Sequence, residues 1–137
     1  MNVLYTAAAT ARGGREGEVV SEDGVLDLEL AIPAEMGGPG GDATNPEQLF
    51  AAGYAACFHS ALRLTAGQRK VDVEGSSITA RVSLGTEGKA FGLAVTLVGA
   101  FPTLDASAAQ ELMEAAHQTC PYSQATRGNI DVALELA

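Results

Sequence analysis

The sequence has few cysteines, few basic residues and no long apolar run, and each shortage excludes a class of protein. Two cysteines in 137 residues cannot form the set of disulfides that stabilises small secreted domains. No apolar stretch approaches the roughly 18 residues that a membrane-spanning helix needs. The first residues show no basic leader followed by an apolar block, so we expect no signal peptide and, by default, a cytoplasmic location.

Positive charge is scarce: eight lysines and arginines stand against seventeen aspartates and glutamates, giving a formal net charge of -9. The basic residues are scattered and form no stripe. Such a surface repels phosphate backbones and anionic lipid headgroups, so we expect neither a nucleic-acid partner nor a membrane partner. The charge does not argue against a neutral, apolar small molecule.

Apolar and small residues are abundant instead. Hydrophobic residues make up 47% of the chain, and its length is that of one ordinary globular domain. The stretch of residues 33–46 is rich in glycine and proline and is expected to be a loop. Because this loop is too short and too central to separate two domains, we expect a single domain over residues 1–137.

Hydrophobic periodicity predicts strands grouped in hairpins and two main helices. Asn45 suits the N-cap of the first helix, Pro46 its first position, and Gly67 lies near its expected end. A stripe at helical spacing marks the second helix: Ala106, Ala109, Leu112, Met113 and Ala116. The expected strands are residues 2–11, 18–21, 25–31, 71–84, 91–101 and 129–136, and the expected helices are 45–65, 105–119 and a short piece at 121–126. The order β-β-β-α-β-β-α-β predicts an α+β fold with a largely antiparallel sheet.

Cys57 lies in the middle of the first helix, within the stretch NPEQLFAAGYAACFHSAL. An unpaired cysteine often serves as a small buried hydrophobe. A position in mid-helix also denies the thiol the helix N-terminal dipole that would lower its pKa. Because the thiolate is the nucleophile, a reactive Cys57 requires a cationic group nearby. The residues alone leave both interpretations open.

Cys120 stands directly before Pro121, and proline favours the first position of a helix. Cys120 is therefore expected near the N-cap of the short helix, where the dipole favours a thiolate. An inert, buried residue at a helix end is an equally good interpretation.

Arg15 and Glu47 are two charged candidates. Arg15 lies in the turn ARGGREGE, where an arginine is usually just solvated. Glycines on both sides permit the turn to fold back, and a guanidinium keeps its charge when partly buried. Glu47 is expected in the first helical turn, where the dipole favours a carboxylate, and it could orient Arg15 through a bidentate pair.

Zinc is the metal to consider, because Cys57, His59, His117 and Cys120 supply two thiols and two imidazoles. Residues i and i+2 of a helix point about 200° apart, so Cys57 and His59 cannot easily share one ion. The spacing matches no standard zinc-finger pattern. We therefore expect no metal site and no cofactor, with both histidines on the surface or satisfied in the core.

Three blocks of sequence resemble the organic hydroperoxide resistance (Ohr) proteins of the OsmC/Ohr superfamily. They are GGREGE around Arg15, NPEQLFAAGYAACF around Glu47 and Cys57, and CPYSQATRGNIDV around Cys120. The resemblance covers almost the whole chain, and the CPYSQATRGN block favours the Ohr branch over its OsmC relatives. It implies an intertwined homodimer with sites at the subunit interface. It also implies a thiol peroxidase that acts on organic and fatty-acid hydroperoxides and is re-reduced by a dihydrolipoyl group on a partner protein.

The same resemblance assigns catalytic roles. Cys57 matches the peroxidatic cysteine, Cys120 matches the resolving cysteine, and Arg15 and Glu47 match the pair that activates the thiol. A bridge between the cysteines requires Cα atoms within about 7 Å. Ten residues separate Glu47 from Cys57, or about 15 Å along a helix axis, so the two cannot touch within one helix. Either Arg15 spans between them, or Glu47 and Cys57 of different subunits meet across antiparallel helices. Our hypothesis is that Arg15, from either subunit, is the bridge.

Phe50 and Phe58 are the expected residues of a substrate pocket, although either could be plain core. Three alternatives to the Ohr interpretation stay open. The first is an OsmC-type hydroperoxidase of broader specificity. The second is a non-catalytic module whose apolar cleft binds a lipid or another hydrophobe. The third is a small zinc protein.

Overall fold

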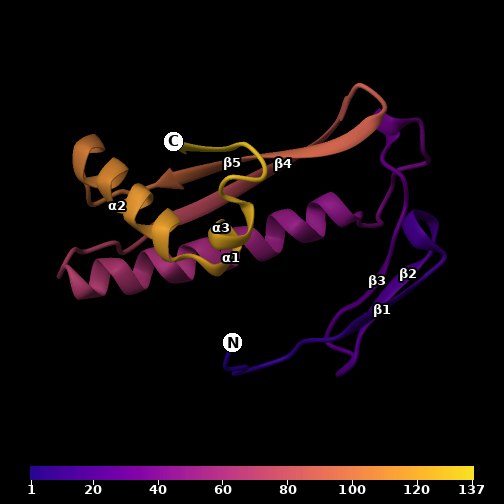
Figure 1. Cartoon of the computed structure of the whole chain (residues 1–137), viewed down its shortest axis with the longest axis horizontal. Coiled ribbons are helices and arrows are strands. Elements are labelled where there is room, and N and C mark those ends of the chain that lie inside the picture. Colours follow the sequence, from indigo (N-terminus) through magenta and orange to yellow (C-terminus); the bar gives the residue numbers. More distant parts are fainter. The chain divides into compact units, whose positions relative to one another are not determined.

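The computed structural model describes all 137 residues, which divide into two compact units, Met1–Leu49 and Phe50–Ala137. Figure 1 labels helices α1 to α3 and strands β1 to β5. The architecture is α+β, as predicted, with two three-stranded sheets. The single domain expected from the length stays a prediction.

The first unit is built on an antiparallel sheet of β1 (Ala9–Arg12), β2 (Glu18–Ser21) and β3 (Asp27–Glu29). The 3-10 turns η1 (Gly14–Glu16) and η2 (Ala34–Met36) lie in its connections. The second strand has the predicted bounds, whereas the first and third are shorter than predicted. Both neighbours pair with β2, which has only four residues, so the ladder limits their length. Leu26 shows the consequence: it lies inside the predicted third strand, but it precedes β3 and is 46% exposed.

Helix α1 (Pro46–Gln68) begins in the first unit and continues through the second. The Gln48 N–H donates to Asn45 Oδ1 at 2.8 Å, so Asn45 caps the helix as predicted. The helix runs past the predicted end, and Gly67 lies inside it. Lys70, with φ 57°, takes the left-handed conformation instead.

The second unit holds the larger sheet, in which β4 (Ser77–Glu87) pairs antiparallel with β5 (Ala90–Ala100). The last strand, β6 (Val132–Leu136), pairs parallel to β5. Residues 71–76 precede β4 as a connection and not as part of the predicted strand. One face of β4 is packed and the other exposed, which is the predicted alternation.

Two further helices complete this unit: α2 (Ala106–Thr119) and α3 (Pro121–Thr126). Asp105 caps α2 by accepting the Ala108 N–H at 2.8 Å. The predicted stripe is buried except for Ala106, which is exposed because it is the first residue of the helix. Figure 1 shows α1 and α2 on the same side of the sheet. The core between them includes Tyr54, Phe58, Leu62, Val95, Leu97, Leu112 and Met113.

No helix in the chain combines the length and the hydropathy that crossing a bilayer requires.

Candidate active site

Helices α1 and α3 bring the two cysteines of the chain together. The Sγ atoms of Cys57 and Cys120 lie 3.7 Å apart, and both thiols are free. A disulfide would need about 2.05 Å, so the sulfurs are in contact without being bonded. Cys120 is buried, whereas Cys57 is partly exposed. Of the two, Cys57 is therefore the one that a solute reaches first.

Cys120 is held by its position between two helices. It is the C-cap of α2 and the N-cap of α3, with φ -65° and ψ 125°. Pro121 favours this extended conformation in the residue before it. The Cys120 N–H donates to the Ala116 carbonyl at 2.9 Å, which ties the residue to the last turn of α2. The predicted placement of Cys120 at the start of the short helix is confirmed.

The environment of Cys57 acts on its pKa in both directions. Burial raises the pKa most, because it disfavours the thiolate, and the neighbouring Cys120 raises it further. The backbone N–H of Tyr122, in the first turn of α3, donates to the sulfur and lowers the pKa. The sequence argument that Cys57, in mid-helix, lies near no helix N-terminus was therefore incomplete. Cys57 lies near the N-terminus of α3. The net effect is that the pKa of Cys57 is raised. A reactive thiolate therefore requires a further positive charge.

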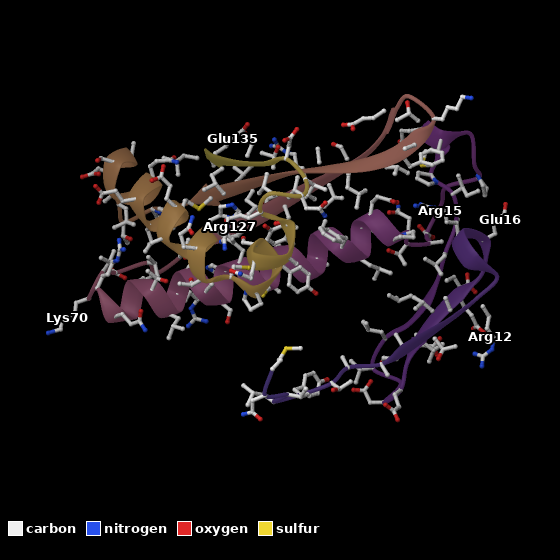
Figure 2. The ribbon with its side chains drawn as sticks, viewed as in Figure 1. Arg12, Arg15, Glu16, Lys70, Arg127 and Glu135 are labelled. Carbon is white, nitrogen blue, oxygen red and sulfur yellow. The ribbon has the colours of Figure 1, made fainter.

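In the first unit, Arg15, labelled in Figure 2, forms a bidentate ion pair with Glu47. Arg15 donates to the two carboxylate oxygens of Glu47 at 2.8 and 2.6 Å. The pairing lowers the pKa of Glu47 and raises that of Arg15. The turn that carries Arg15 depends on Gly13 and Gly14, with φ 80° and 56°, which disfavour any residue with a Cβ. The pairing inferred for these residues is present, and their part in catalysis stays a prediction.

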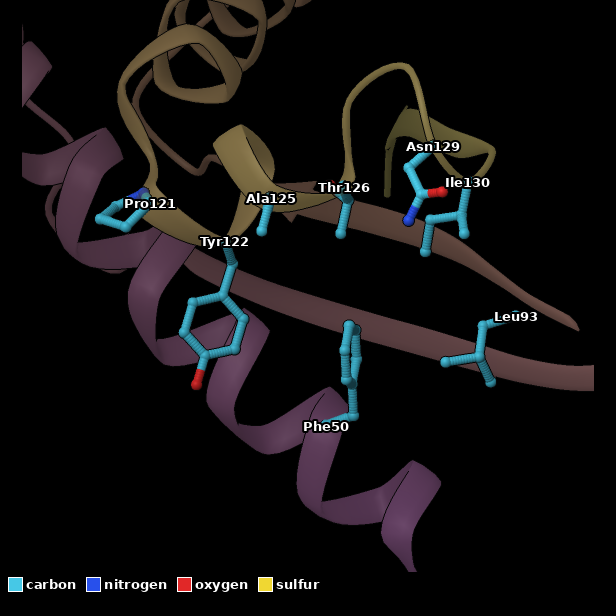
Figure 3. Close-up of a pocket in the computed structure, with 8 residues that line it drawn as sticks. All are labelled: Phe50, Leu93, Pro121, Tyr122, Ala125, Thr126, Asn129 and Ile130. Carbon is cyan, nitrogen blue, oxygen red and sulfur yellow. The ribbon is translucent and has the colours of Figure 1, made fainter. Parts of the chain in front are cut away.

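An apolar cavity of about 510 Å³ opens in the second unit (Figure 3). Phe50, one of the two residues predicted for a substrate pocket, lines this cavity, and the use of the cavity by a substrate stays a prediction. Phe58 does not line it, because it is fully buried in the core. The complete lining is Phe50, Leu93, Pro121, Tyr122, Ala125, Thr126, Asn129 and Ile130. Most of these residues lie in the block after Cys120, so the cavity wall and the second thiol come from one segment.

Tyr122 connects the cavity to the thiols. Its ring lines the cavity, and its backbone N–H donates to Cys57. The ring lies against α1 at Gly53, where an added Cβ would be 2.9 Å from the Tyr122 hydroxyl oxygen. Sequence reasoning did not single out Tyr122 or Gly53, although the paired blocks around Cys57 and Cys120 contain both.

The two histidines have hydroxyl partners. His59 Nε2 lies 3.0 Å from Ser76 Oγ, and His117 Nδ1 lies 2.7 Å from Ser123 Oγ. Burial lowers the pKa of both, and nearby arginines lower it further. No group of three or more histidine, cysteine, aspartate or glutamate side chains gathers as metal ligands.

Comparison with known proteins places this geometry in a family. Residues 38–135 match the family model described as OsmC-like protein. An organic hydroperoxide resistance protein of Xanthomonas axonopodis pv. citri is 57% identical, and the match covers 98% of this chain and 96% of the relative.

Solved structures agree with this match. The crystal structure of an organic hydroperoxide resistance protein from Legionella pneumophila aligns with a TM-score of 0.92 at 51% identity, covering 99% of both chains. That of OhrB from Bacillus subtilis aligns with a TM-score of 0.89 at 50% identity, covering 98% of this chain and all (100%) of the other. The chain therefore belongs to the OsmC/Ohr superfamily, as a member of its organic hydroperoxide resistance proteins.

Proposed function

We propose that the protein is a thiol peroxidase that reduces organic hydroperoxides to alcohols. The observation that carries the proposal is the contact between two free thiols, one accessible and one buried, with Sγ atoms 3.7 Å apart. Family membership supports it, because the relatives are named for resistance to organic hydroperoxides. A peroxidase needs an accessible sulfur to attack the peroxide and a second sulfur close enough to condense with the product.

The first step is attack of the Cys57 thiolate on the terminal peroxide oxygen. The O–O bond breaks, Cys57 becomes a sulfenic acid, and the leaving alkoxide takes a proton to become the alcohol. Burial raises the pKa of Cys57, so the thiolate needs a cation. In our proposal Arg15, oriented by Glu47, supplies this charge and also stabilises the alkoxide as it leaves.

The second step joins the two sulfurs. The Cys120 sulfur attacks the sulfenic acid of Cys57, a disulfide forms, and water leaves. A dithiol then reduces the bridge by exchange and is itself oxidised to a disulfide. We propose a dihydrolipoyl group on a partner protein as this reductant. The net reaction converts one hydroperoxide and one dithiol into one alcohol, one water and one disulfide.

The cavity supports an apolar substrate. None of its lining residues is charged. An alkyl tail in the cavity would therefore be removed from water without contacting a charged group. Tyr122 belongs both to this lining and to the surroundings of Cys57. We propose that the tail of a fatty-acid or other organic hydroperoxide occupies the cavity.

We also propose that the protein works as a homodimer. The first unit buries only one hydrophobic residue, Leu30, which is too little for a stable core. It exposes seven large hydrophobic residues: Met1, Val3, Leu4, Tyr5, Val25, Leu26 and Met36. A second copy of the chain would cover this surface. Light scattering behind a sizing column should give twice the chain mass of 14.0 kDa; a monomer at micromolar concentration would contradict the dimer.

Peroxide consumption driven by dihydrolipoamide tests the proposed function. We expect turnover of cumene hydroperoxide by the wild-type protein and none by Cys57→Ser. Cys120→Ser is the matched control: without the dithiol it should consume about one equivalent and leave Cys57 as a sulfenic acid, whereas the wild type should end as the disulfide. Equal turnover by wild type and Cys57→Ser would overturn the proposal.

The apolar cavity also fits a second candidate, a non-catalytic module that binds hydrophobic ligands. Binding of a fluorescent fatty acid without peroxide turnover, unchanged in Cys57→Ser, would favour that module.

A broader OsmC-type specificity is distinguished by rate: we expect bulky organic hydroperoxides to react faster than hydrogen peroxide.

A further inference from the structure

A buried cluster of hydroxyl groups lies beside the two thiols and takes no part in the chemistry proposed above. The Tyr54 hydroxyl oxygen lies 2.8 Å from Ser123 Oγ and 2.9 Å from Thr126 Oγ1. Ser123 Oγ lies 2.7 Å from His117 Nδ1. Tyr54, Ser123 and Thr126 are all buried. Each interior hydroxyl therefore has a partner, as buried polar groups require.

The cluster joins the same two helices as the thiols, in matching register. Tyr54 precedes Cys57 by three residues on α1, and Ser123 follows Cys120 by three residues at the start of α3. Residues three apart share a helix face. The pair Cys57–Cys120 and the pair Tyr54–Ser123 are thus neighbouring contacts between α1 and α3, one turn apart.

Helix α3 has little stability of its own. It has six residues and no side-chain cap, whereas isolated helices shorter than about 12 residues are marginal in water. Its position depends on tertiary contacts. Arg127, labelled in Figure 2, adds one by donating to the His117 carbonyl at 2.6 Å, and the hydroxyl cluster adds buried hydrogen bonds.

We infer that Tyr54, Ser123 and His117 are positioning residues that hold Cys120 against Cys57 and so set the rate and equilibrium of disulfide formation. Closure of the bridge requires the sulfurs to approach from 3.7 Å to about 2.05 Å. This approach is short only while α3 stays anchored to α1. Without the anchor, α3 frays, the effective concentration of Cys120 at Cys57 falls, and the bridge forms more slowly and less completely. The inference concerns the second step of the proposed function.

The donors and acceptors in the cluster are consistent with a neutral His117. Thr126 donates to the Ser123 carbonyl or to the Tyr54 oxygen, Tyr54 donates to Ser123, and Ser123 donates to the unprotonated Nδ1 of His117. Burial and the neighbouring Arg127 lower the pKa of His117, which favours this neutral form. The chain of hydrogen bonds then ends on an acceptor, and no buried donor is left unpaired.

Tyr54→Phe and Ser123→Ala test the inference, because each deletes a hydroxyl with little change of shape. Rapid quenching after one equivalent of cumene hydroperoxide, followed by mass spectrometry, separates Cys57 sulfenic acid from the disulfide. We expect sulfenic acid to appear within twofold of the wild-type rate and disulfide closure to slow about tenfold. Under excess peroxide, more Cys57 should be over-oxidised to sulfinic acid.

A second measurement needs no peroxide and so stands apart from the proposed function. In dithiothreitol redox buffers, we expect the disulfide equilibrium constant of both variants to fall about tenfold, which is about 30 mV less negative for a two-electron couple. If the wild type never consumes peroxide, the proposed function fails and this test still decides the inference. The inference would be overturned if both variants kept the rate of disulfide closure and the disulfide equilibrium constant within twofold of wild type. Faster closure in the variants would also overturn it.

Two controls guard against a general loss of stability. Ser107→Ala removes an exposed hydroxyl from α2 and should leave closure unchanged. His117→Asn keeps an acceptor near the position of Nδ1, and its disulfide should close faster than that of His117→Leu.

Hydrogen exchange of the wild type adds a readout that needs no variant. The Gln124 and Arg127 amides, which bond to the carbonyls of Cys120 and Ser123, should exchange as slowly as those of α2, and fast exchange would contradict the anchoring.

Discussion

The guanidinium of Arg15 donates to both carboxylate oxygens of Glu47, at 2.8 and 2.6 Å, across 32 residues of sequence. The side chains are partly covered, with exposed fractions of 35% and 15%. An arginine that donates to both oxygens is fixed in direction as well as position. The pair therefore presents an oriented positive charge from a hairpin turn that sequence alone would leave solvated.

Glu47→Gln should weaken the proposed catalysis without unfolding the chain. The substitution removes the charge that orients Arg15 and keeps the shape of the side chain. Hydrogen bonds to charged groups contribute about 1.5–3 kcal/mol, so we expect kcat/KM for cumene hydroperoxide to fall about 10- to 100-fold. Glu16→Gln, in the same turn as Arg15 and exposed, is the matched control and should match wild type.

Arg15→Ala should raise the pKa of Cys57. Burial and Cys120 already raise it, so in our proposal the guanidinium must outweigh them to give a thiolate near neutral pH. The ultraviolet absorbance of the thiolate, followed against pH in Cys120→Ser and in the double variant, measures the difference. A thiol that stays protonated well above neutrality in both proteins would contradict the peroxidase mechanism.

The stability of the fold should depend on Glu47 in acid. Arg15 holds the pKa of Glu47 below its ordinary value, so the folded state binds its proton less readily than the unfolded state. The pair therefore contributes its full stability above the unfolded pKa of about 4.3, and the contribution is lost as pH falls through the lower folded pKa. Urea unfolding between neutral pH and pH 3 should show a smaller loss of stability for Glu47→Gln than for wild type.

Gly53→Ala should change substrate binding more than it changes stability. The new Cβ would lie 2.9 Å from the Tyr122 hydroxyl oxygen and 3.3 Å from its ring. Tyr122 is 40% exposed, so its ring can shift, and this shift moves one wall of the cavity. We expect a several-fold change in KM for bulky hydroperoxides with little change in melting temperature.

Gly67→Ala is the matched control for that substitution. It lies in the same helix, and an added Cβ there meets no atom within 4 Å. Replacing glycine in a helix interior should stabilise the protein by about 0.5–1 kcal/mol, with KM unchanged. If Gly53→Ala and Gly67→Ala behave alike in KM, Tyr122 does not form part of the substrate site.

Local structure was largely predictable from the sequence. The strand at residues 18–21 and the helix at residues 121–126 have the predicted bounds. Asn45 was predictable as an N-cap and Cys120 as the residue before a helix, because caps, prolines and apolar periodicity act over a few residues. The same local signals overestimated the first strand, since a strand extends only as far as its partner does.

Tertiary structure decided what lies opposite each of these elements. No local pattern indicates that β6 runs parallel to β5. Nor does one indicate that Cys57 lies near the Tyr122 N–H at the start of α3, or that the hydroxyls of Tyr54 and Ser123 are hydrogen-bonded. Each depends on the packing of segments more than 30 residues apart. The sequence by itself determined which chemical groups the site has and which helix or turn carries each one. Only the packing of α1 against α3 decided that two thiols and a chain of buried hydroxyls stand one turn apart, because those distances follow from the shared core.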